Sequence, residues 1–260
     1  MRTERLFAMR TQDRDRVGGL AKGLAIIEAF EAASPRLTVT EAARKTGLTR
    51  AAARRYLLTL ESLGFAESDG KLYWLTPRVL RLGYAYLSTA SVPKIAQPIL
   101  DGIGERTEDV ASLATLDGAE VVFLARSSIR RIVAATTNVG TRRPAYCTAM
   151  GRVMLASRPD AEVRRLLRRA PLRRLTPHTK TEIDQLMAEI AGARASGFCV
   201  IDQELELGLR TIAVPVADSR GTVELALAVS LQAVRMTVED MVQRILPELQ
   251  AGRRALERML

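Results

Sequence analysis

The sequence predicts an α+β protein in which a small helical domain precedes a larger domain of helices and antiparallel strands. The first part shows three helical segments followed by a hairpin pattern, which is typical of a winged helix-turn-helix. The second part alternates helical segments with strands that are joined by short turns. Apolar residues make up 47% of the 260-residue chain, which is enough to build a core and argues against global disorder.

The helical pattern begins at Gly19, after which apolar residues recur at helical spacing as far as the segment ASPR. Thr38 or Thr40 can cap a second helix, and Thr49 can cap a third helix, with Gly64 just past its C-terminus. The segment FAESDGKLYWLT then predicts two short strands around an Asp-Gly turn. Three helices and a wing therefore account for the first domain.

A linker helix is predicted where the pattern changes, because Val79, Leu82 and Tyr86 recur at roughly helical spacing after Pro77. This segment is too short to be a domain, and it separates two differently patterned regions. The predicted organisation is a flexible tail at residues 1–16, the winged helix-turn-helix at 17–76, the linker helix at 77–91 and the second domain at 92–260.

The second domain reads as strands in pairs with helices between them. VASLATLDGAEVVFLARSS predicts two strands around Asp117-Gly118, RIVAATTNVG and FCVIDQE predict one strand each, and RTIAVPVADSRGTVELALAVSLQ predicts a hairpin. Helical periodicity marks the segments KIAQPILDGIGERTE, AMGRVMLAS, DAEVRRLLRRA and TEIDQLMAEIAGARASG. The chain closes with a helix that Pro247 is expected to kink.

Charge and composition limit the classes of partner. The net charge is +10, and residues 1–90 hold 15 basic and 9 acidic residues, so the first third of the chain is its more basic part. This balance favours a polyanionic partner. Aromatic residues amount to only 4%, which argues against a single-strand nucleic-acid binder built on base stacking.

The sequence does not support a membrane protein, a secreted protein or a metal-binding protein. No apolar run approaches the ~20 residues that cross a bilayer, and the charged N-terminus lacks the apolar stretch of a secretory signal. We therefore expect a cytoplasmic protein with no membrane partner. Cys147 and Cys199 match no metal-binding spacing, so we expect two free thiols, no metal site and no cofactor.

The segment TVTEAARKTGLTRAAARRYLLTL predicts a surface that reads double-stranded DNA. Ala43 lets two helices approach, Gly47 supplies the turn between them, and Leu57 faces the core. The exposed start of the third helix then carries only small and guanidinium side chains, which suit a DNA groove. A solvated basic face is the alternative, but the hairpin that follows favours DNA binding. The predicted DNA contacts are Lys22, Thr38, Thr49, Arg50, Ala51, Ala52, Arg54, Arg55 and Lys71.

Two sets of motifs are similar to those of IclR-type bacterial transcriptional regulators. One set is GLAKGLAIIEAF with LTVTEAARKTGLTRAAARRYLLTLESLGF, and the other is PAYCTAMGRVMLA, GFCVIDQELELGLRTIAVPV and ALAVSLQ. The resemblance covers residues 17–258 in family order, and it extends to the branch that regulates aromatic-acid catabolism, the β-ketoadipate pathway and 4-hydroxybenzoate use. It implies a DNA-binding regulator rather than an enzyme, with a GAF-like C-terminal domain that binds a small carboxylic acid.

The resemblance also implies partners and a ligand site. Family members dimerise through the N-terminal part and often pair into tetramers, and an activator would recruit RNA polymerase. The start of the helix after PAYC offers free N–H groups that favour a carboxylate, and the hydroxyls of Thr211 and Ser230 can bond a ligand. Some family members carry Ser or Cys where this chain has Thr211 and Ala228. The implied effector contacts are Tyr146, Thr148, Ala149, Met150, Gly151, Asp202, Leu209, Thr211, Ala228 and Ser230.

Several of these residues also have simpler interpretations. Asp202 and Glu204 would share one face of a strand, but capping a turn or pairing with Arg210 is favoured over acid–base catalysis. Cys147 could touch a ligand or simply pack. Cys199 is expected in the core, and the only histidine, His178, is expected at the surface.

Two alternative functions remain beside the regulator. One is a constitutive DNA-binding repressor with no small-molecule ligand. The other is a small-acid enzyme, although the spacing of the residues shows no nucleophile–base set. The run RRLLRRAPLRRL is expected to be a solvated helix face rather than a second nucleic-acid surface.

Overall fold

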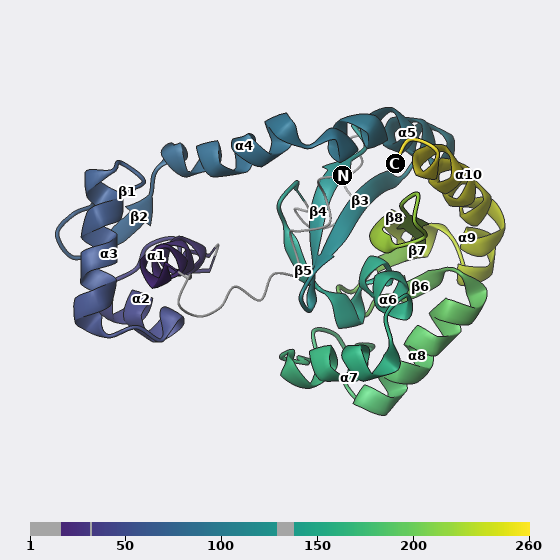
Figure 1. Ribbon diagram of the computed structural model, residues 1–260. Helices are drawn as coiled ribbons and strands as arrows, with labels where there is room; N and C mark the ends of the chain where they lie inside the picture. The colour runs from purple at the N-terminus through teal and green to yellow at the C-terminus, as the bar shows by residue number, and fades with distance from the viewer. Residues whose placement is uncertain (1–16, 32, 129–137) are drawn as a thin grey trace. The chain divides into compact units, whose positions relative to one another are not determined.

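The chain folds into two compact units that meet in sequence between Ser88 and Thr89. The computed structural model describes residues 17–31, 33–128 and 138–260 (Figure 1). The predicted tail at residues 1–16 and most of the predicted strand RIVAATTNVG lie outside the described residues.

The N-terminal unit contains the predicted three helices and hairpin. Its buried core is formed by apolar residues from all of these elements and from the connection before α2, including Ile26, Leu37, Ala53, Leu57 and Tyr73. The hairpin strands are antiparallel. The elements are α1 (Gly18–Glu28), α2 (Val39–Thr46), α3 (Arg50–Ser62), β1 (Ala66–Ser68) and β2 (Tyr73–Leu75).

Local signals in the sequence set the ends of these helices. Thr38, and not Thr40, caps α2: its hydroxyl accepts a hydrogen bond from the Glu41 N–H, and the Glu41 carboxylate accepts one from the Thr38 N–H at 2.8 Å. Gly47 ends α2 with φ +68°, which costs glycine little. Thr49 then caps α3 by accepting from the Ala52 N–H at 3.2 Å. Both threonine caps expected from the sequence are confirmed.

A 3-10 turn, η2 (Pro77–Val79), and the helix α4 (Leu80–Thr89) follow the hairpin. The predicted linker helix is therefore present, although its first turn is tighter than an α-helix. Apolar side chains on α4 remain exposed: Leu80 and Tyr84 are each 70% exposed, and Leu82 is 48% exposed. No apolar face of this helix is buried within the described part of the chain.

Six strands in the described part of the C-terminal unit form one antiparallel sheet, in the order β5-β4-β3-β8-β7-β6. The short strand β5 was not predicted, because three residues of the segment RRP carry no alternation from which a strand could be recognised. The strands are β3 (Val110–Asp117), β4 (Glu120–Arg126), β5 (Arg142–Pro144), β6 (Cys199–Asp202), β7 (Leu209–Ala217) and β8 (Val223–Gln232).

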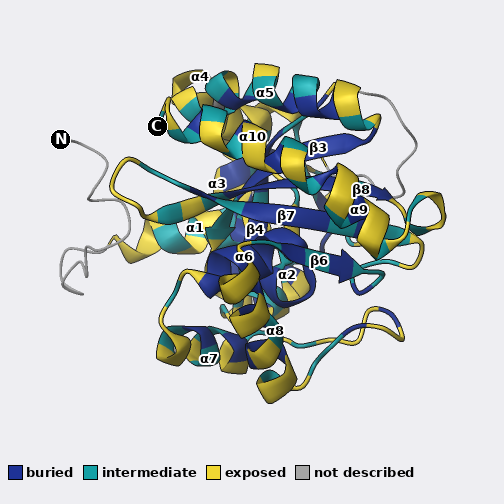
Figure 2. Cartoon of the chain, turned by 90° about the vertical axis from the view of Figure 1, so that its right-hand side faces the viewer, coloured by how far each residue is buried: buried dark blue, intermediate teal, exposed yellow. Residues whose placement is uncertain are grey.

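Helices cover both faces of this sheet (Figure 2). One face packs against α5 (Ser91–Thr107), α9 (Val238–Arg244) and α10 (Leu246–Glu257). The other face packs against α6 (Ala149–Ala156), with α8 (Ile183–Ser196) beside α6 and α7 (Asp160–Arg169) beside α8. At the C-terminus the expected kink is a break between α9 and α10, and Pro247 lies in the first turn of α10, where its missing N–H costs no helical bond.

The two faces of the sheet differ in side-chain size. In β8, Leu227, Val229 and Leu231 pack toward α5 and α10, whereas Ala226 and Ala228 pack toward α6. Small side chains on one face let α6 lie close to the strands. The alternation of large and small residues in LALAVS therefore favours a strand, and its small residues allow the covering helix to pack closely.

Gly151 marks a second close contact of α6, with the turn that precedes the helix. A Cβ atom at Gly151 would lie 2.2 Å from the carbonyl oxygen of Ala145 and 2.4 Å from its Cα atom. Real Cβ atoms do not approach backbone atoms so closely, so any side chain would push α6 away from the turn that precedes it.

We expect Gly151→Ala to destabilise the C-terminal unit by about 3 kcal/mol or more, because backbone must move to relieve the overlap. Urea unfolding followed by far-UV circular dichroism measures the loss. Gly192→Ala is the matched control: Gly192 lies exposed in α8, and a Cβ there meets nothing within 4 Å. That variant should gain up to about 1 kcal/mol from helix propensity. Equal stability of the two variants would refute the close packing of α6.

Candidate functional site

The exposed face of α3 begins directly after its cap. Arg50, Arg54 and Arg55 are exposed, and Ala51 lies exposed between them, while the opposite face buries Leu57 into the core. Among the described residues, no ion pair involves these three arginines. Their guanidinium groups are therefore available to an external anion, and the small side chain beside them leaves room for close approach.

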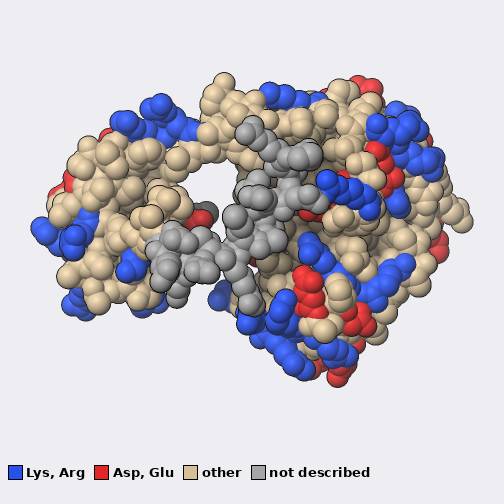
Figure 3. All heavy atoms as spheres, viewed as in Figure 1, with Lys and Arg blue, Asp and Glu red and all other residues tan. Residues whose placement is uncertain are grey.

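The other predicted DNA contacts fall into two kinds. Lys22 on α1 and Lys71 in the hairpin turn are exposed side chains. The hydroxyls of Thr38 and Thr49, by contrast, already accept backbone N–H groups as helix caps. Figure 3 shows Lys and Arg side chains over the surface of the N-terminal unit. The contacts themselves stay predictions.

One arginine that packs against the hairpin, Arg36, was not among the predicted DNA contacts. The Arg36 guanidinium lies over the Trp74 ring, 4.4 Å from its centroid, and the Trp74 indole N–H donates to the Glu67 carboxylate at 3.1 Å. Arg36 and Trp74 are far apart in sequence, and only the bridge between Leu37 and Tyr73 brings them together. A second basic group is thereby held beside the wing.

A cavity in the C-terminal unit lies between the sheet and the start of α6. Its walls are mostly apolar, with hydroxyl groups and one guanidinium group set into them, as is typical of sites for small molecules. The lining residues are Val110, Ser112, Phe123, Arg126, Cys147, Thr148, Ala149, Met150, Ile201, Leu205, Leu209, Thr211 and Ser230.

Strand register brings the polar groups of the sheet into this cavity. Thr211 on β7 lies opposite Ser230 on β8, and their hydroxyl oxygens are 2.9 Å apart. Ser112 on β3 lies opposite Arg126 on β4. Paired residues point to the same face of an antiparallel sheet, and here that face is the one covered by α6.

The start of α6 forms the opposite wall. The Thr148 hydroxyl accepts from the Gly151 N–H at 3.2 Å and lies 3.1 Å from the Pro144 carbonyl oxygen, to which it donates. The N–H groups of Ala149 and Met150, in the first turn of the helix, have no carbonyl partner within the helix. The positive end of α6 therefore faces the cavity.

Six of the ten predicted effector contacts line this cavity, namely Thr148, Ala149, Met150, Leu209, Thr211 and Ser230. The other four lie outside the lining. Tyr146 is buried and donates its hydroxyl to the Arg173 carbonyl oxygen at 2.6 Å. Asp202 pairs with Arg210 at 2.8 Å. Gly151 is buried against the turn that precedes α6, and Ala228 is buried where α6 packs on the sheet.

Sequence reasoning did not name several residues of the lining: Val110, Ser112, Phe123, Arg126, Ile201 and Leu205. Most of these lie on strands, and alternation along a strand shows that two residues share a face without showing which face it is. The predicted contacts came from family motifs at the start of α6 and on β7 and β8. These motifs do not include β3 or β4, which lie far away in sequence.

A buried ion pair joins the two walls of the cavity. Arg152 on α6 is fully buried, and its two terminal nitrogens contact the Glu204 carboxylate at 2.8 Å and 2.6 Å. The Arg152 Nε group also donates to the Tyr146 carbonyl oxygen at 2.9 Å. Glu204 lies beyond the end of β6, so the expectation that it shares a strand face with Asp202 is wrong. Each carboxylate pairs with its own arginine.

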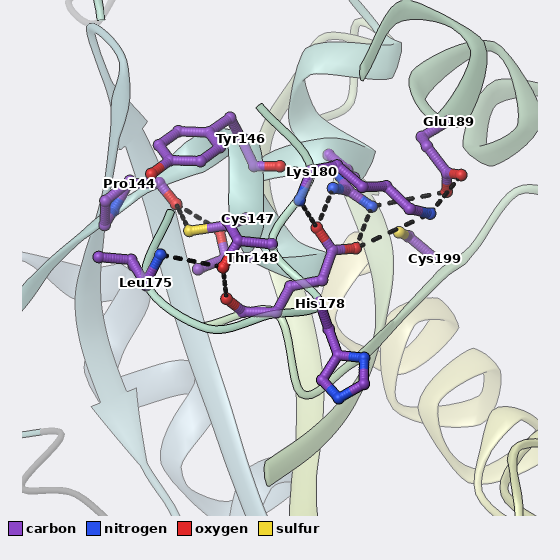
Figure 4. A network of polar contacts seen from close by, with 12 residues as sticks. Pro144, Tyr146, Cys147, Thr148, Leu175, His178, Lys180, Glu189 and Cys199 are labelled. Carbon is purple, nitrogen blue, oxygen red and sulfur yellow. Dashed lines mark hydrogen bonds and ion pairs between the residues drawn. The ribbon is translucent and has the colours of Figure 1, made fainter. Parts of the chain in front are cut away.

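The network continues on both sides of this pair. Glu204 also accepts from the Lys180 N–H at 3.1 Å, and Glu189 lies 3.5 Å from Arg152. The Thr179 hydroxyl donates to the Glu204 carbonyl oxygen at 2.6 Å. In Figure 4, Pro144 and Cys147 lie at one end of the network, and Lys180 and Glu189 lie toward the other. The connection after α7 is thereby tied to the cavity wall.

The two cysteines are buried, and the histidine is exposed. Burial raises the pKa of the Cys147 thiol to about 12 and that of the Cys199 thiol to about 11, so both remain thiols at neutral pH. Cys147 lines the cavity, and Cys199 packs in the core as expected. His178 is exposed, also as expected.

The arginine-rich run RRLLRRAPLRRL forms α7 and the chain after it. Val163 and Leu167 on α7 are buried, whereas Arg165 and Arg168 are exposed. This is the amphipathic arrangement expected of a solvated helix face.

The part of the chain that the structure describes contains neither a metal-binding cluster nor a membrane-spanning helix. No group of three or more His, Cys, Asp or Glu side chains there is placed to hold a metal ion. Within the same residues, every helix is too short or too polar to cross a lipid bilayer.

Two family models match the chain. The IclR helix-turn-helix domain matches residues 19–70, from α1 to the turn of the hairpin. The C-terminal domain of bacterial IclR transcriptional regulators matches residues 84–258, which include the whole sheet and the helices that cover it.

Known relatives extend over nearly the whole chain. The Pca regulon regulatory protein of Pseudomonas putida is 45% identical over 247 residues, covering 95% of this chain and 85% of the relative. The p-hydroxybenzoate hydroxylase transcriptional activator of Acinetobacter baylyi is 40% identical over 245 residues, covering 92% and 89%. An IclR homolog from Microbacterium hydrocarbonoxydans, solved in complex with 4-hydroxybenzoate, has a TM-score of 0.71 at 26% identity, covering 92% and 98%.

Removing one partner of the buried ion pair is expected to cost more stability than removing both. Arg152→Met would leave Glu204 buried without its main partner, so we expect a loss of about 3–5 kcal/mol in the free energy of unfolding. Adding Glu204→Leu to that variant removes the unpaired charge and should restore part of the loss.

The control for this prediction is the half-exposed pair between Arg158 and Glu162, whose atoms lie 3.4 Å apart. Arg158→Met should cost less than about 1 kcal/mol. Urea unfolding followed by circular dichroism measures all of the variants. Equal losses from Arg152→Met and Arg158→Met would show that the buried pair does not hold the cavity walls.

Proposed function

The chain belongs to the IclR family of bacterial transcriptional regulators, and on that premise we propose that it controls genes of aromatic-acid catabolism in response to a small aromatic acid. It is a DNA-binding regulator and not an enzyme. The cavity between α6 and the sheet is the proposed effector site, and the start of α3 is the proposed reading surface.

The lining of the cavity is the observation that carries the effector proposal. Phe123, Met150 and Leu209 supply an apolar wall suited to a ring, while Thr211 and Ser230 supply hydroxyl groups. Among the described residues of the lining, none is Asp or Glu. An apolar cavity with hydroxyls and the positive end of α6 at one wall favours an anion with a flat apolar body. The IclR homolog from Microbacterium hydrocarbonoxydans, solved in complex with 4-hydroxybenzoate, supports the same class of ligand.

The DNA-binding proposal assigns the exposed start of α3 to the major groove of an operator. Arg50 and Arg54 lie one turn apart on one face, and Ala51 between them allows close approach. The proposed phosphate contacts are Lys22, Arg55 and Lys71. The caps Thr38 and Thr49 would hold the N-termini of α2 and α3 near the DNA backbone. The operator lies in the cytoplasm, so we propose that the protein acts there.

Assembly is proposed from the exposed apolar residues of the N-terminal unit and the linker. Val17 and Leu20 on or next to α1 are 72% and 65% exposed, and Leu80 and Tyr84 on α4 are each 70% exposed. Apolar surface of this extent is typical of an interface. We propose a homodimer formed through residues 17–91, able to pair into a dimer of dimers and, if it activates, to recruit RNA polymerase. Residues 92–260 are the proposed effector-binding domain.

We expect Arg50→Ala and Arg54→Ala each to weaken binding of an operator fragment by about 1–3 kcal/mol, because a base-contacting or phosphate-contacting arginine is lost. Fluorescence anisotropy at fixed salt concentration measures the dissociation constants. Arg165→Ala, on the exposed face of α7, is the control and should bind like wild type. Wild-type binding by both α3 variants would place the reading surface elsewhere.

We expect 4-hydroxybenzoate at millimolar concentration to raise the melting temperature of the protein, since a ligand that binds only the folded state stabilises it. Ser230→Ala removes one of the two paired hydroxyls and should reduce the preference for 4-hydroxybenzoate over benzoate by up to about tenfold. Thermal shift and calorimetry measure these effects. If no aromatic acid stabilises the protein, a DNA-binding repressor without a ligand becomes the better interpretation.

A further inference from the structure

One buried hydroxyl group of the cavity lining, that of Ser112 on β3, has no partner within the described part of the chain. Ser112 is 5% exposed and lines the cavity. Its hydroxyl makes no hydrogen bond to any residue that the structure describes. A buried hydroxyl without a partner is unfavourable, so this group is suited to a partner that enters the cavity from outside the chain.

The other hydroxyl groups of the described lining are already engaged. The Thr148 hydroxyl donates its proton to the Pro144 carbonyl oxygen. The hydroxyl oxygens of Thr211 and Ser230 lie 2.9 Å apart, so this pair uses one of its two protons internally. Within the described lining, only Ser112 therefore keeps its proton and its lone pairs entirely for a ligand.

Ser112 and Ser230 lie on one diagonal of a square of four residues on β3 and β8. Ser112 is opposite Ala228. Val110 is opposite Ser230, so the two apolar residues occupy the other diagonal. Diagonal neighbours on a sheet are roughly 7–8 Å apart. The Ser230 hydroxyl bonds Thr211 on β7, which lies on the side of β8 away from β3.

This separation decides how a ligand can use the two serines. A single oxygen atom joins two hydrogen-bond partners that are at most about 5.6 Å apart. The hydroxyls of Ser112 and Ser230 are therefore suited to two different polar atoms of one ligand. Strands on both sides of β3 hold the backbone of Ser112, so the position of its hydroxyl is well defined.

The first turn of α6 gives the cavity its other polar end. The N–H groups of Ala149 and Met150 have no carbonyl partner within the helix, and the helix dipole is positive there. A carboxylate is stabilised at that wall, so the far end of an aromatic acid turns toward the sheet. Its ring substituents then meet the hydroxyls of Ser112 and Ser230.

We propose that Ser112 is a specificity-determining residue, whose hydroxyl bonds a ring substituent that the Thr211–Ser230 pair does not reach. This inference rests on the proposed effector site and adds the substituent that the site reads. Oxygen atoms on adjacent ring positions lie about one hydrogen-bond length apart, so two of them span the roughly 7–8 Å diagonal. When the 4-position of a benzoate meets Ser230, its 3-position meets Ser112. The chemical class is an aromatic acid with a hydrogen-bonding group at the 3-position.

Titration calorimetry on the full-length protein tests this assignment with benzoate, 3-hydroxybenzoate and 4-hydroxybenzoate. Ser230→Ala is the matched control for Ser112→Ala, because it removes the same atom from the same face of the sheet. Wild type should bind 3-hydroxybenzoate about 3- to 10-fold more tightly than benzoate, which is the contribution of one hydrogen bond.

Ser112→Ala should bring the affinity for 3-hydroxybenzoate to within about twofold of that for benzoate, while 4-hydroxybenzoate keeps its advantage. Ser230→Ala should have the opposite effect on the two hydroxybenzoates. Ser112→Cys keeps the size of the side chain but donates weakly, so its preference should lie between those of wild type and Ser112→Ala.

Equal wild-type affinities for 3-hydroxybenzoate and benzoate would overturn the inference without any variant. An unchanged preference in Ser112→Ala, or an equal loss of all three acids in both Ser112 variants, would also overturn it. If wild type binds 4-hydroxybenzoate in any of these cases, the effector site stands and only the role of Ser112 is wrong. If wild type binds none of the acids, the effector site itself is wrong.

Discussion

The buried pair between Arg152 and Glu204 is the interaction on which the C-terminal unit depends. Arg152 lies one turn after the helix start that lines the cavity, and Glu204 directly precedes the lining residue Leu205. Two charges removed from water are tolerated only when nearly every polar atom is satisfied. Here the guanidinium has the carboxylate and the Tyr146 carbonyl oxygen, and the carboxylate has the Lys180 N–H as well. Both walls of the cavity are thereby held at a defined separation.

Close packing of α6 is the second requirement, and it follows from small residues rather than from charge. Gly151 allows the helix to meet the turn before it, and Ala226 and Ala228 let the helix approach the sheet. Where the strand residues on that face become polar and somewhat larger, at Ser230 and Thr211, the helix begins and the cavity opens. The cavity is thus the place where packing of small residues gives way to hydroxyl groups.

Much of this could be predicted from local sequence, since caps and alternation act within a few residues. Thr38 and Thr49 cap their helices. The six predicted effector contacts that share one cavity were implied instead by the resemblance to the family. Long-range register could not be predicted. Arg126 reaches the cavity only because β4 pairs with β3, and Arg152 meets Glu204 across 52 residues of sequence. The two carboxylates Asp202 and Glu204 were grouped by spacing, yet the strand ends between them.

Burial separates arginines of the same chemistry into three roles. Arg50 and its neighbours on α3 are exposed, so their attraction to phosphates is screened by salt and shared among many counterions. Arg152 is fully buried and satisfied, so it has no capacity left for a ligand. Arg126 lies between these extremes, half-buried in the lining of the cavity. The same side chain therefore meets bulk solvent, a ligand-sized space or a buried carboxylate, according to where the fold places it.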